Sequence, residues 1–258
     1  MALWGHVKSY LREPMPFEDL LKRQMARRVD HVFAYTESGG AQAERYLGPG
    51  RVTVVQNSIQ APGASLAHDR GRAFDTIPAQ REAARFLFLG GLDESKRIDF
   101  LVSAVSRLAR SVPGFQLIVA GDGTHVNQLQ RAASLGLPVK LVGRATGAEK
   151  LRLAEACSGI LMPGRVGLVA VDALQLGLPL VTTRWPYHGP EADYLVDGRT
   201  AIFTEDTVES FVGTVQHLAS SPRLRAEMAS ACLQDAARFS LEETVRRFES
   251  GILTVLAE

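Results

Sequence analysis

The segment RFLFLGGLDESKRIDFLVSAVSRLAR, residues 85–110, contains the pattern that decides the fold. Four apolar residues follow Arg85 and end at Gly90 and Gly91, which is typical of a strand buried on both faces of a sheet. After Lys96, apolar side chains recur at helical spacing instead, at Ile98, Leu101, Val102, Val105 and Leu108. The segment therefore predicts a strand, a glycine turn and a helix.

The same alternation continues to Trp185. Further strands are predicted over 115–123, 139–145, 159–164 and 179–185, and the helices between them over 125–136, 148–159 and 167–177. Strict alternation with short connections predicts a parallel sheet covered on both faces by helices. A last helix is predicted over 240–257, where Ser240 and Glu243 have the spacing of a capping box.

The front of the chain repeats the pattern on a smaller scale. Its predicted strands cover 1–6, 31–38 and 51–58, and its predicted helices cover 17–29 and 41–48. A doubly wound domain usually has roughly 100 to 150 residues, so this front predicts part of a domain whose first half is absent. The predicted division is a partial N-terminal domain over 1–58, a linker over 59–84, a main domain over 85–240, and a C-terminal helix over 241–258 that returns toward the N-terminal domain.

The composition excludes several classes of protein. The 258 residues are 46% hydrophobic and 22% charged, with a net charge of +1, which gives no reason to expect a nucleic-acid partner. No apolar run approaches the roughly 18 residues that span a bilayer, and the start lacks the apolar core of a signal peptide. Because Cys157 and Cys232 fit no ligand spacing, we expect buried thiols in a cytoplasmic protein. Peripheral contact with the inner membrane face through the basic helix 17–29 is an alternative to a merely solvated face.

Glycine-containing loops follow four of the predicted strands. In open α/β sheets ligands bind outside the carboxyl ends of the strands, where glycines let the backbone approach a phosphate and free helix N–H groups donate to it. One such loop is a weak signal, because glycines end strands throughout this fold class. Four on one edge predict a nucleotide-sized site, and the loops are Gly90–Leu92, Gly121–Thr124, Gly143–Arg144 and Pro163–Gly167.

Three charged residues near these loops fit an anionic ligand. Lys96 lies at a predicted helix start, where a phosphate would offset the unfavourable position, although a solvated lysine explains it equally well. Arg165 suits a diphosphate through bidentate contact. Asp172 lies among apolar residues and needs a polar partner, which a pair of ribose hydroxyls would supply.

Other site classes are disfavoured. The loop Gly121-Asp122-Gly123 lacks the third glycine of the dinucleotide fingerprint, which argues against a dehydrogenase. The histidines show no metal-ligand spacing, so no metal site is predicted.

From residue 85 to 198 the order of these motifs resembles the nucleotide-sugar domain of glycosyltransferase family 4, the retaining group 1 glycosyl transferases of the GT-B fold. Asp172-Ala173 and Gly177-Leu178-Pro179 match the second acid of the family motif and the end of its helix. Two positions depart from the pattern: Gly164 replaces the first glutamate, and Gly91 replaces a frequent arginine. PGRVGL at 163–168 and HGPEADYLVDG at 188–198 are similar to a bacterial subgroup.

The resemblance implies a complete Rossmann-like donor domain and a partial Rossmann-like acceptor domain. It also implies a metal-independent, cofactor-free transfer with retention, from a UDP- or GDP-sugar to a sugar or lipid-linked acceptor in polysaccharide or glycoconjugate synthesis. It nominates His6, Lys96 and Arg165 as catalytic residues. The donor-binding residues that it predicts are Gly90, Gly91, Lys96, Gly121, Gly143, Arg144, Gly164, Arg165, Val166, Gly167, Leu168, Val169, Asp172 and Glu191.

Two alternatives stay open at this point. The departure at Gly164 and the short front also fit a nucleotide-sugar-binding remnant or partner subunit without turnover. A nucleotide-sugar epimerase of the same two-domain shape is the alternative within enzymes.

Overall fold

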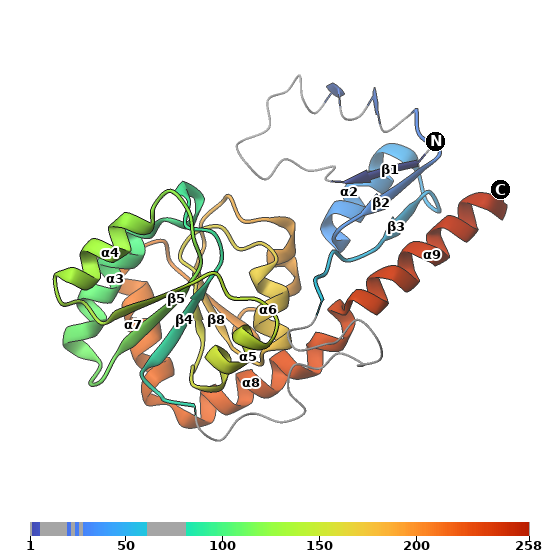
Figure 1. Cartoon of the computed structure of the whole chain (residues 1–258). Coiled ribbons are helices and arrows are strands. Elements are labelled where there is room, and N and C mark those ends of the chain that lie inside the picture. The colour runs from blue at the N-terminus through green and yellow to red at the C-terminus, as the bar shows by residue number, and fades with distance from the viewer. Residues whose placement is uncertain (1, 6–19, 22–23, 26–27, 61–80, 258) are drawn as a thin grey trace.

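The computed structural model describes residues 2–5, 20–21, 24–25, 28–60 and 81–257, and these form two units, each built on a parallel sheet (Figure 1). The larger sheet has six strands in the order β6-β5-β4-β7-β8-β9. The smaller sheet has three strands in the order β1-β2-β3. The predicted α/β class with parallel sheets is confirmed.

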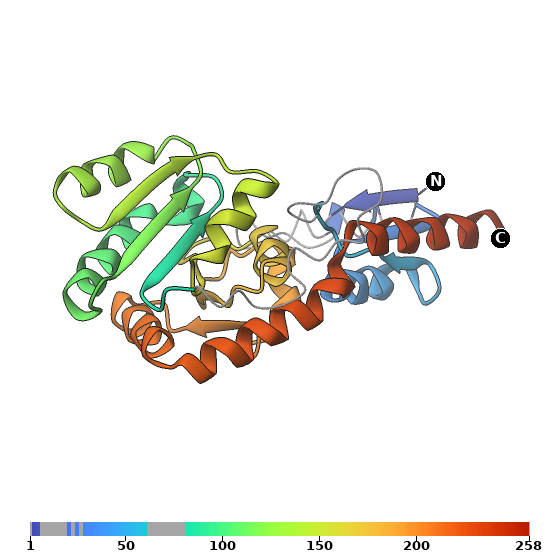
Figure 2. The same cartoon turned by 60° about the horizontal axis from the view of Figure 1, so that its bottom comes forward.

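The larger unit alternates strands and helices. Its strands are β4 (Arg85–Leu89), β5 (Gln116–Ala120), β6 (Val139–Gly143), β7 (Ile160–Leu161), β8 (Leu180–Thr183) and β9 (Ala201–Thr204). Its helices are α3 (Ile98–Ser111), α4 (Val126–Ser134), α5 (Ala148–Glu155), α6 (Val169–Gln175), α7 (Val208–Ser220) and α8 (Pro222–Ala236). Short 3-10 turns are η1 (Glu94–Lys96), η2 (Pro190–Tyr194) and η3 (Ala237–Phe239). Helices α3, α4 and α7 cover one face of the sheet, and α5, α6 and α8 cover the other (Figures 1 and 2).

The opening motif folds as predicted, with one difference at the start of its helix. The four apolar residues of β4 are buried, and so are the helix positions Ile98, Leu101, Val105 and Leu108, whereas Val102 is half-buried. The helix begins at Ile98 and not at Lys96, because Arg97 has a left-handed φ of 54° that separates α3 from η1. Lys96 therefore ends a 3-10 turn that the Asp93 side chain caps.

The strand order places a crevice at the carboxyl ends of β4 and β7. From β4 the chain adds β5 and β6 on one side of the sheet, and then crosses back to add β7, β8 and β9 on the other. The loops after β4 and β7 consequently lead to helices on opposite faces. Ligands of doubly wound sheets bind at such a switch point.

The smaller unit consists of β1 (Ala2–Gly5), β2 (His31–Ala34), β3 (Val52–Val54) and α2 (Glu37–Leu47), and α9 (Leu241–Ala257) packs on β2 and β3. Figure 1 shows α9 running from the larger unit along the smaller one. Phe248 of α9 stacks on Phe33, with ring centroids 4.5 Å apart, and meets Trp4 edge-on at 5.5 Å. Aromatic packing therefore fixes the C-terminal helix to the small sheet.

The predicted capping box at the start of α9 is half formed. Ser240 Oγ accepts a hydrogen bond from the Glu243 N–H at 3.1 Å, as expected. The Glu243 carboxylate accepts from Arg246 and Arg247 instead of reaching back to the cap. Two arginines one turn away compete for the carboxylate that a capping box requires.

Several predictions concern residues that lie wholly or partly outside the described ranges. Residues 61–80 of the predicted linker and most of the predicted basic helix 17–29 lie outside the described residues, so the domain boundaries and the membrane contact stay predictions. Leu20, Leu21 and Met25 are helical and exposed. None of the helices in the described ranges is long and apolar enough to cross a membrane.

Gly251 tests the docking of α9. A Cβ at this position would lie 2.5 Å from Phe33 Cε1 and 2.6 Å from Thr53 Oγ1. We expect Gly251→Ala to lower the thermal midpoint, because overpacking costs about 1–3 kcal/mol and outweighs the better helix propensity of alanine. The matched control is Gly213→Ala in α7, where nothing lies within 4 Å of the added Cβ and the midpoint should hold or rise. A higher midpoint in both variants would contradict the packing of α9 on the sheet.

Candidate functional site

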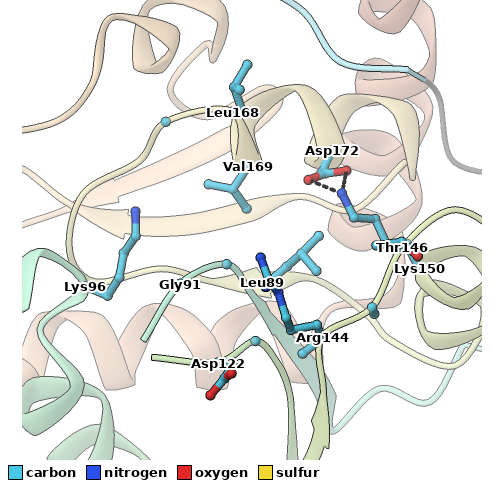
Figure 3. Close-up of a pocket in the computed structure, with 15 residues that line it drawn as sticks. Leu89, Gly91, Lys96, Asp122, Arg144, Thr146, Lys150, Leu168, Val169 and Asp172 are labelled. Carbon is cyan, nitrogen blue, oxygen red and sulfur yellow. Dashed lines mark hydrogen bonds and ion pairs between the residues drawn. The ribbon is translucent and has the colours of Figure 1, made fainter. Parts of the chain in front are cut away.

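A cavity of about 400 Å³ occupies the crevice at the switch point (Figure 3). Most of the predicted donor-binding residues line it: Gly90, Gly91, Lys96, Gly121, Arg144, Gly167, Leu168, Val169 and Asp172. Sequence reasoning missed the other lining residues, which are Leu89, Ala120, Asp122, Ala145, Thr146 and Lys150. The cavity brings together loops from four strands, as the sequence predicts.

The remaining predicted residues lie elsewhere. Gly143, Gly164, Arg165, Val166 and Glu191 are not among the residues that line the cavity, and His6 lies outside the described residues. Gly143 instead supports a neighbouring loop, since its carbonyl accepts from the Gly121 N–H at 2.8 Å. The predicted ligand contacts of these residues stay predictions.

Lys96 and Arg165 tie the two sides of the crevice together. Lys96 Nζ donates to the Arg165 carbonyl at 2.6 Å, and the Arg165 N–H donates to the Ser95 carbonyl at 2.8 Å. Burial lowers the pKa of Lys96, and nearby Asp93 and Glu191 oppose that shift. In Figure 3 the Lys96 side chain extends toward the loop before α6. The Arg165 guanidinium donates to the Tyr187 carbonyl at 3.3 Å, and Arg165 is not among the residues that line the cavity.

The contact between the β7–α6 loop and η1 requires a glycine at position 164. A Cβ at this position would lie 2.3 Å from the Ser95 carbonyl oxygen and 2.6 Å from the Lys96 carbonyl carbon. No side chain fits there, so the glutamate of the resembled family could not occupy this position without moving the loop. The glycine lets the β7–α6 loop close on η1.

Not every backbone amide of the predicted donor-binding residues 166–169 is available to a ligand. The Val166 N–H donates to His188 Nδ1 at 3.1 Å, and is therefore already used. Within the described part of the chain, the N–H groups of Gly167, Leu168 and Val169, which line the cavity at the start of α6, donate to no other group. These are the amides that remain for an anion.

Asp172 has a partner that the sequence analysis did not identify. Lys150 Nζ of α5 lies 2.7 Å from one carboxylate oxygen of Asp172 and 2.9 Å from the other, as the dashed lines in Figure 3 show. Asp172 is 5% exposed, and burial raises the pKa of its carboxyl while Lys150 opposes that rise. The carboxylate among apolar residues correctly signalled a polar partner. In this structure the Lys150 ammonium is that partner, and the predicted contact with a ribose stays a prediction.

Two residues of the segment 188–194 link it by hydrogen bonds to neighbouring segments. His188 Nε2 donates to the Thr183 carbonyl at 2.8 Å, which leaves Nδ1 free to accept from Val166. Glu191 is 6% exposed, and its Oε1 accepts from Asn57 Nδ2 of the smaller unit at 3.0 Å. Glu191 therefore joins the two units.

In the described ranges, no group of three or more His, Cys, Asp or Glu side chains is placed to hold a metal ion.

Comparison with known proteins assigns the family. The model of the family "Glycosyl transferases group 1" matches residues 83–221, which is more than half of the 258 residues. The chain belongs to the group 1 glycosyl transferases. The matched region contains β4 to β9, and so every residue that lines the cavity.

Two curated relatives match parts of this member of the family. The glycogen synthase of Mycobacterium tuberculosis is 28% identical over 186 residues, which are 69% of this chain and 42% of that protein. The GDP-mannose-dependent alpha-(1-6)-phosphatidylinositol monomannoside mannosyltransferase of Mycolicibacterium smegmatis is 31% identical over 157 residues, 55% of this chain and 40% of that protein. The chain thus spans less than half of the length of these relatives.

Solved structures share the fold. The pneumococcal O-GlcNAc transferase GtfA, crystallised in complex with UDP and GlcNAc, superposes with a TM-score of 0.72 at 17% sequence identity. The match covers 100% of this chain and 53% of GtfA. The GT-B-like architecture expected from the sequence is confirmed.

Gly164→Ala tests the closure of the β7–α6 loop. The added Cβ meets backbone atoms, which cannot rotate away, so we expect a loss of about 1–3 kcal/mol of stability and a distorted cavity. Thermal unfolding of this variant beside Gly213→Ala measures the effect. An unchanged midpoint would show that the loop does not pack on η1.

His188 predicts a pH dependence of stability. Burial lowers the pKa of His188 from its usual 6.5, so the folded protein takes up this proton less readily than the unfolded chain. Its contribution is therefore fully present above about pH 6.5 and declines as the pH falls below that value. We expect His188→Gln to flatten the decline in thermal midpoint between pH 6.5 and pH 5. The exposed His217→Gln variant should keep the wild-type slope, and equal slopes in all three proteins would contradict the assignment.

Proposed function

We propose that this chain transfers a sugar from a nucleoside diphosphate sugar to an acceptor, with retention and without a metal ion. The observation that carries the proposal is the charge of the cavity wall. The wall contains three cationic side chains, Lys96, Arg144 and Lys150, and two carboxylates, Asp122 and Asp172. An excess of cations at a switch point suits a ligand that carries phosphates. The GDP-mannose-dependent relative and the UDP complex of GtfA support a nucleotide as the ligand.

The diphosphate would lie between Lys96 and the amides of Gly167 and Leu168. Burial makes the ammonium of Lys96 less favourable, and an anion beside it would reverse that effect. As the glycosidic bond breaks, negative charge grows on the departing diphosphate, and fixed donors stabilise that charge most where water is excluded. Lys96 would thus stabilise the leaving group.

The nucleoside would extend toward α5. Arg144 and Thr146 line this side of the cavity, and the base would lie beside Gly143 and Arg144. The ribose would then meet Asp172, whose carboxylate lies on the first turn of α6. The sugar would face the smaller unit, where Asn57 and Glu191 meet and where the acceptor would approach.

Retention and metal independence are parts of this proposal. Side-chain cations would balance the diphosphate charge that a divalent ion balances in other transferases. Asp172 is bound by Lys150, and Asp122 lies on the opposite side of the cavity in Figure 3, so the lining carboxylates do not form the close pair of a retaining glycosidase. Retention would then require that the acceptor attacks on the face of the sugar from which the diphosphate leaves, without a carboxylate nucleophile.

A thermal-shift panel with UDP, GDP, ADP, CMP and TDP, with and without EDTA, tests the proposal. A ligand at a hundred times its Kd stabilises by about 2.7 kcal/mol, which is roughly 5–10 °C for a chain of this size. We expect one diphosphate to give such a shift, and EDTA should not change it. Lys96→Ala should lower the affinity for that diphosphate at least tenfold. Lys140→Ala is the matched control, because Lys140 is exposed and does not line the cavity.

Turnover is measured separately with the sugar nucleotide that contains the preferred base. We expect slow hydrolysis of the donor, which Lys96→Ala abolishes. For an α-linked donor, proton NMR should show that the α-anomer is released first. Binding without hydrolysis or transfer would favour the partner-subunit alternative. A flat panel from a cooperatively folded sample would overturn the proposal.

A further inference from the structure

The pairing of Lys150 with Asp172 adds a second polar group to the part of the cavity where the proposed function places the ribose. The two side chains come from different helices, α5 and α6, and both line the cavity. Lys150 is 19% exposed at its side chain and Asp172 only 7%. The Lys150 side chain is therefore at least as accessible to a ligand as the Asp172 side chain.

The pair combines functions that neither residue has alone. An ionised carboxylate only accepts hydrogen bonds, and an ammonium only donates, through three N–H groups. Two of the ammonium donors are directed at the Asp172 oxygens, at 2.7 and 2.9 Å, which leaves one for another acceptor. Each hydroxyl of a ribose both donates and accepts, so it can satisfy the carboxylate and the ammonium together.

Stability alone gives little reason for this pair. Removing two charges from water carries a desolvation cost that the attraction between them often fails to exceed, and apolar residues of similar size would fill the space as well. The neighbours of Asp172 on α6, Val169 and Ala173, are already apolar and buried. An ion pair in a cavity wall is better explained by a ligand that uses it.

We propose that Lys150 is a specificity-determining residue that, together with Asp172, selects ribonucleoside diphosphates over their 2′-deoxy counterparts. The inference rests on the proposed function, because it assumes that a nucleotide occupies the cavity. Loss of the 2′-hydroxyl removes the group that accepts from Lys150 and donates to Asp172, and it leaves buried polar groups without that partner. Sites built to bind a hydroxyl reject analogues that lack it.

Calorimetric titration with UDP, GDP, 2′-deoxy-UDP and 2′-deoxy-GDP tests the proposal in the wild type and in variants of Lys150. We expect the wild type to bind the ribonucleotide of the preferred base at least tenfold more tightly than its deoxy form. Lys150→Met should reduce that ratio to within threefold, and Lys150→Arg, which keeps the charge, should preserve most of it. Equal ratios in the wild type and Lys150→Met would overturn the proposal.

A second series covers the case in which Lys150→Met fails to fold because Asp172 is left buried without its cation. Asp172→Asn keeps Lys150 and should retain a several-fold preference for the ribonucleotide. The double variant Lys150→Met with Asp172→Asn removes both charges and should lose that preference. The same preference in both variants would overturn the role of Lys150.

The outcomes separate this inference from the proposed function. Binding of a ribonucleotide and its deoxy form with equal affinity to the wild type overturns the selectivity of the pair and leaves the nucleotide site standing. No binding of any of the four nucleotides to the folded wild type overturns both.

Discussion

Two backbone segments meet at the switch point of the larger sheet, and the cavity depends on how closely they approach. The loop after β7 packs on η1 with no space for a Cβ at Gly164. Hydrogen bonds from Arg165 to Ser95 and from Lys96 to Arg165 cross the same contact. Because one segment follows β4 and the other precedes α6, this contact fixes both walls of the site relative to each other. A side chain at Gly164 would separate them.

The charged groups of the site are arranged around that contact in a largely buried environment. Lys96 and Asp172 both have pKa values displaced by burial toward the neutral form, and each has a close polar partner. Charges interact more strongly where water is scarce, and fixed partners need no reorganisation when a ligand arrives. The polar groups of the cavity are therefore held in place in advance, as the proposed anionic, hydroxyl-bearing ligand would require.

The segment 188–194 connects this site to the smaller unit. His188 holds the Val166 amide of the loop, and three residues further along, Glu191 accepts from Asn57. The Tyr194 hydroxyl donates to the Tyr35 carbonyl at 2.8 Å. A change in the angle between the two units must stretch or break these bonds. The geometry of the loop is thus coupled to the position of the unit from which an acceptor would approach.

The sequence by itself determined the α/β alternation, the edge of the sheet that holds the site, and most of the residues that line the cavity. Strands buried in a parallel sheet read as apolar runs, and the glycines after them mark the close approaches of backbone, so local pattern is sufficient for these features. Only the tertiary structure decided which polar groups meet. Lys150 and Asp172 lie on separate helices, and His188 takes the Val166 amide from a later loop. Such pairings depend on how helices pack across the sheet, which residue spacing along the chain does not specify.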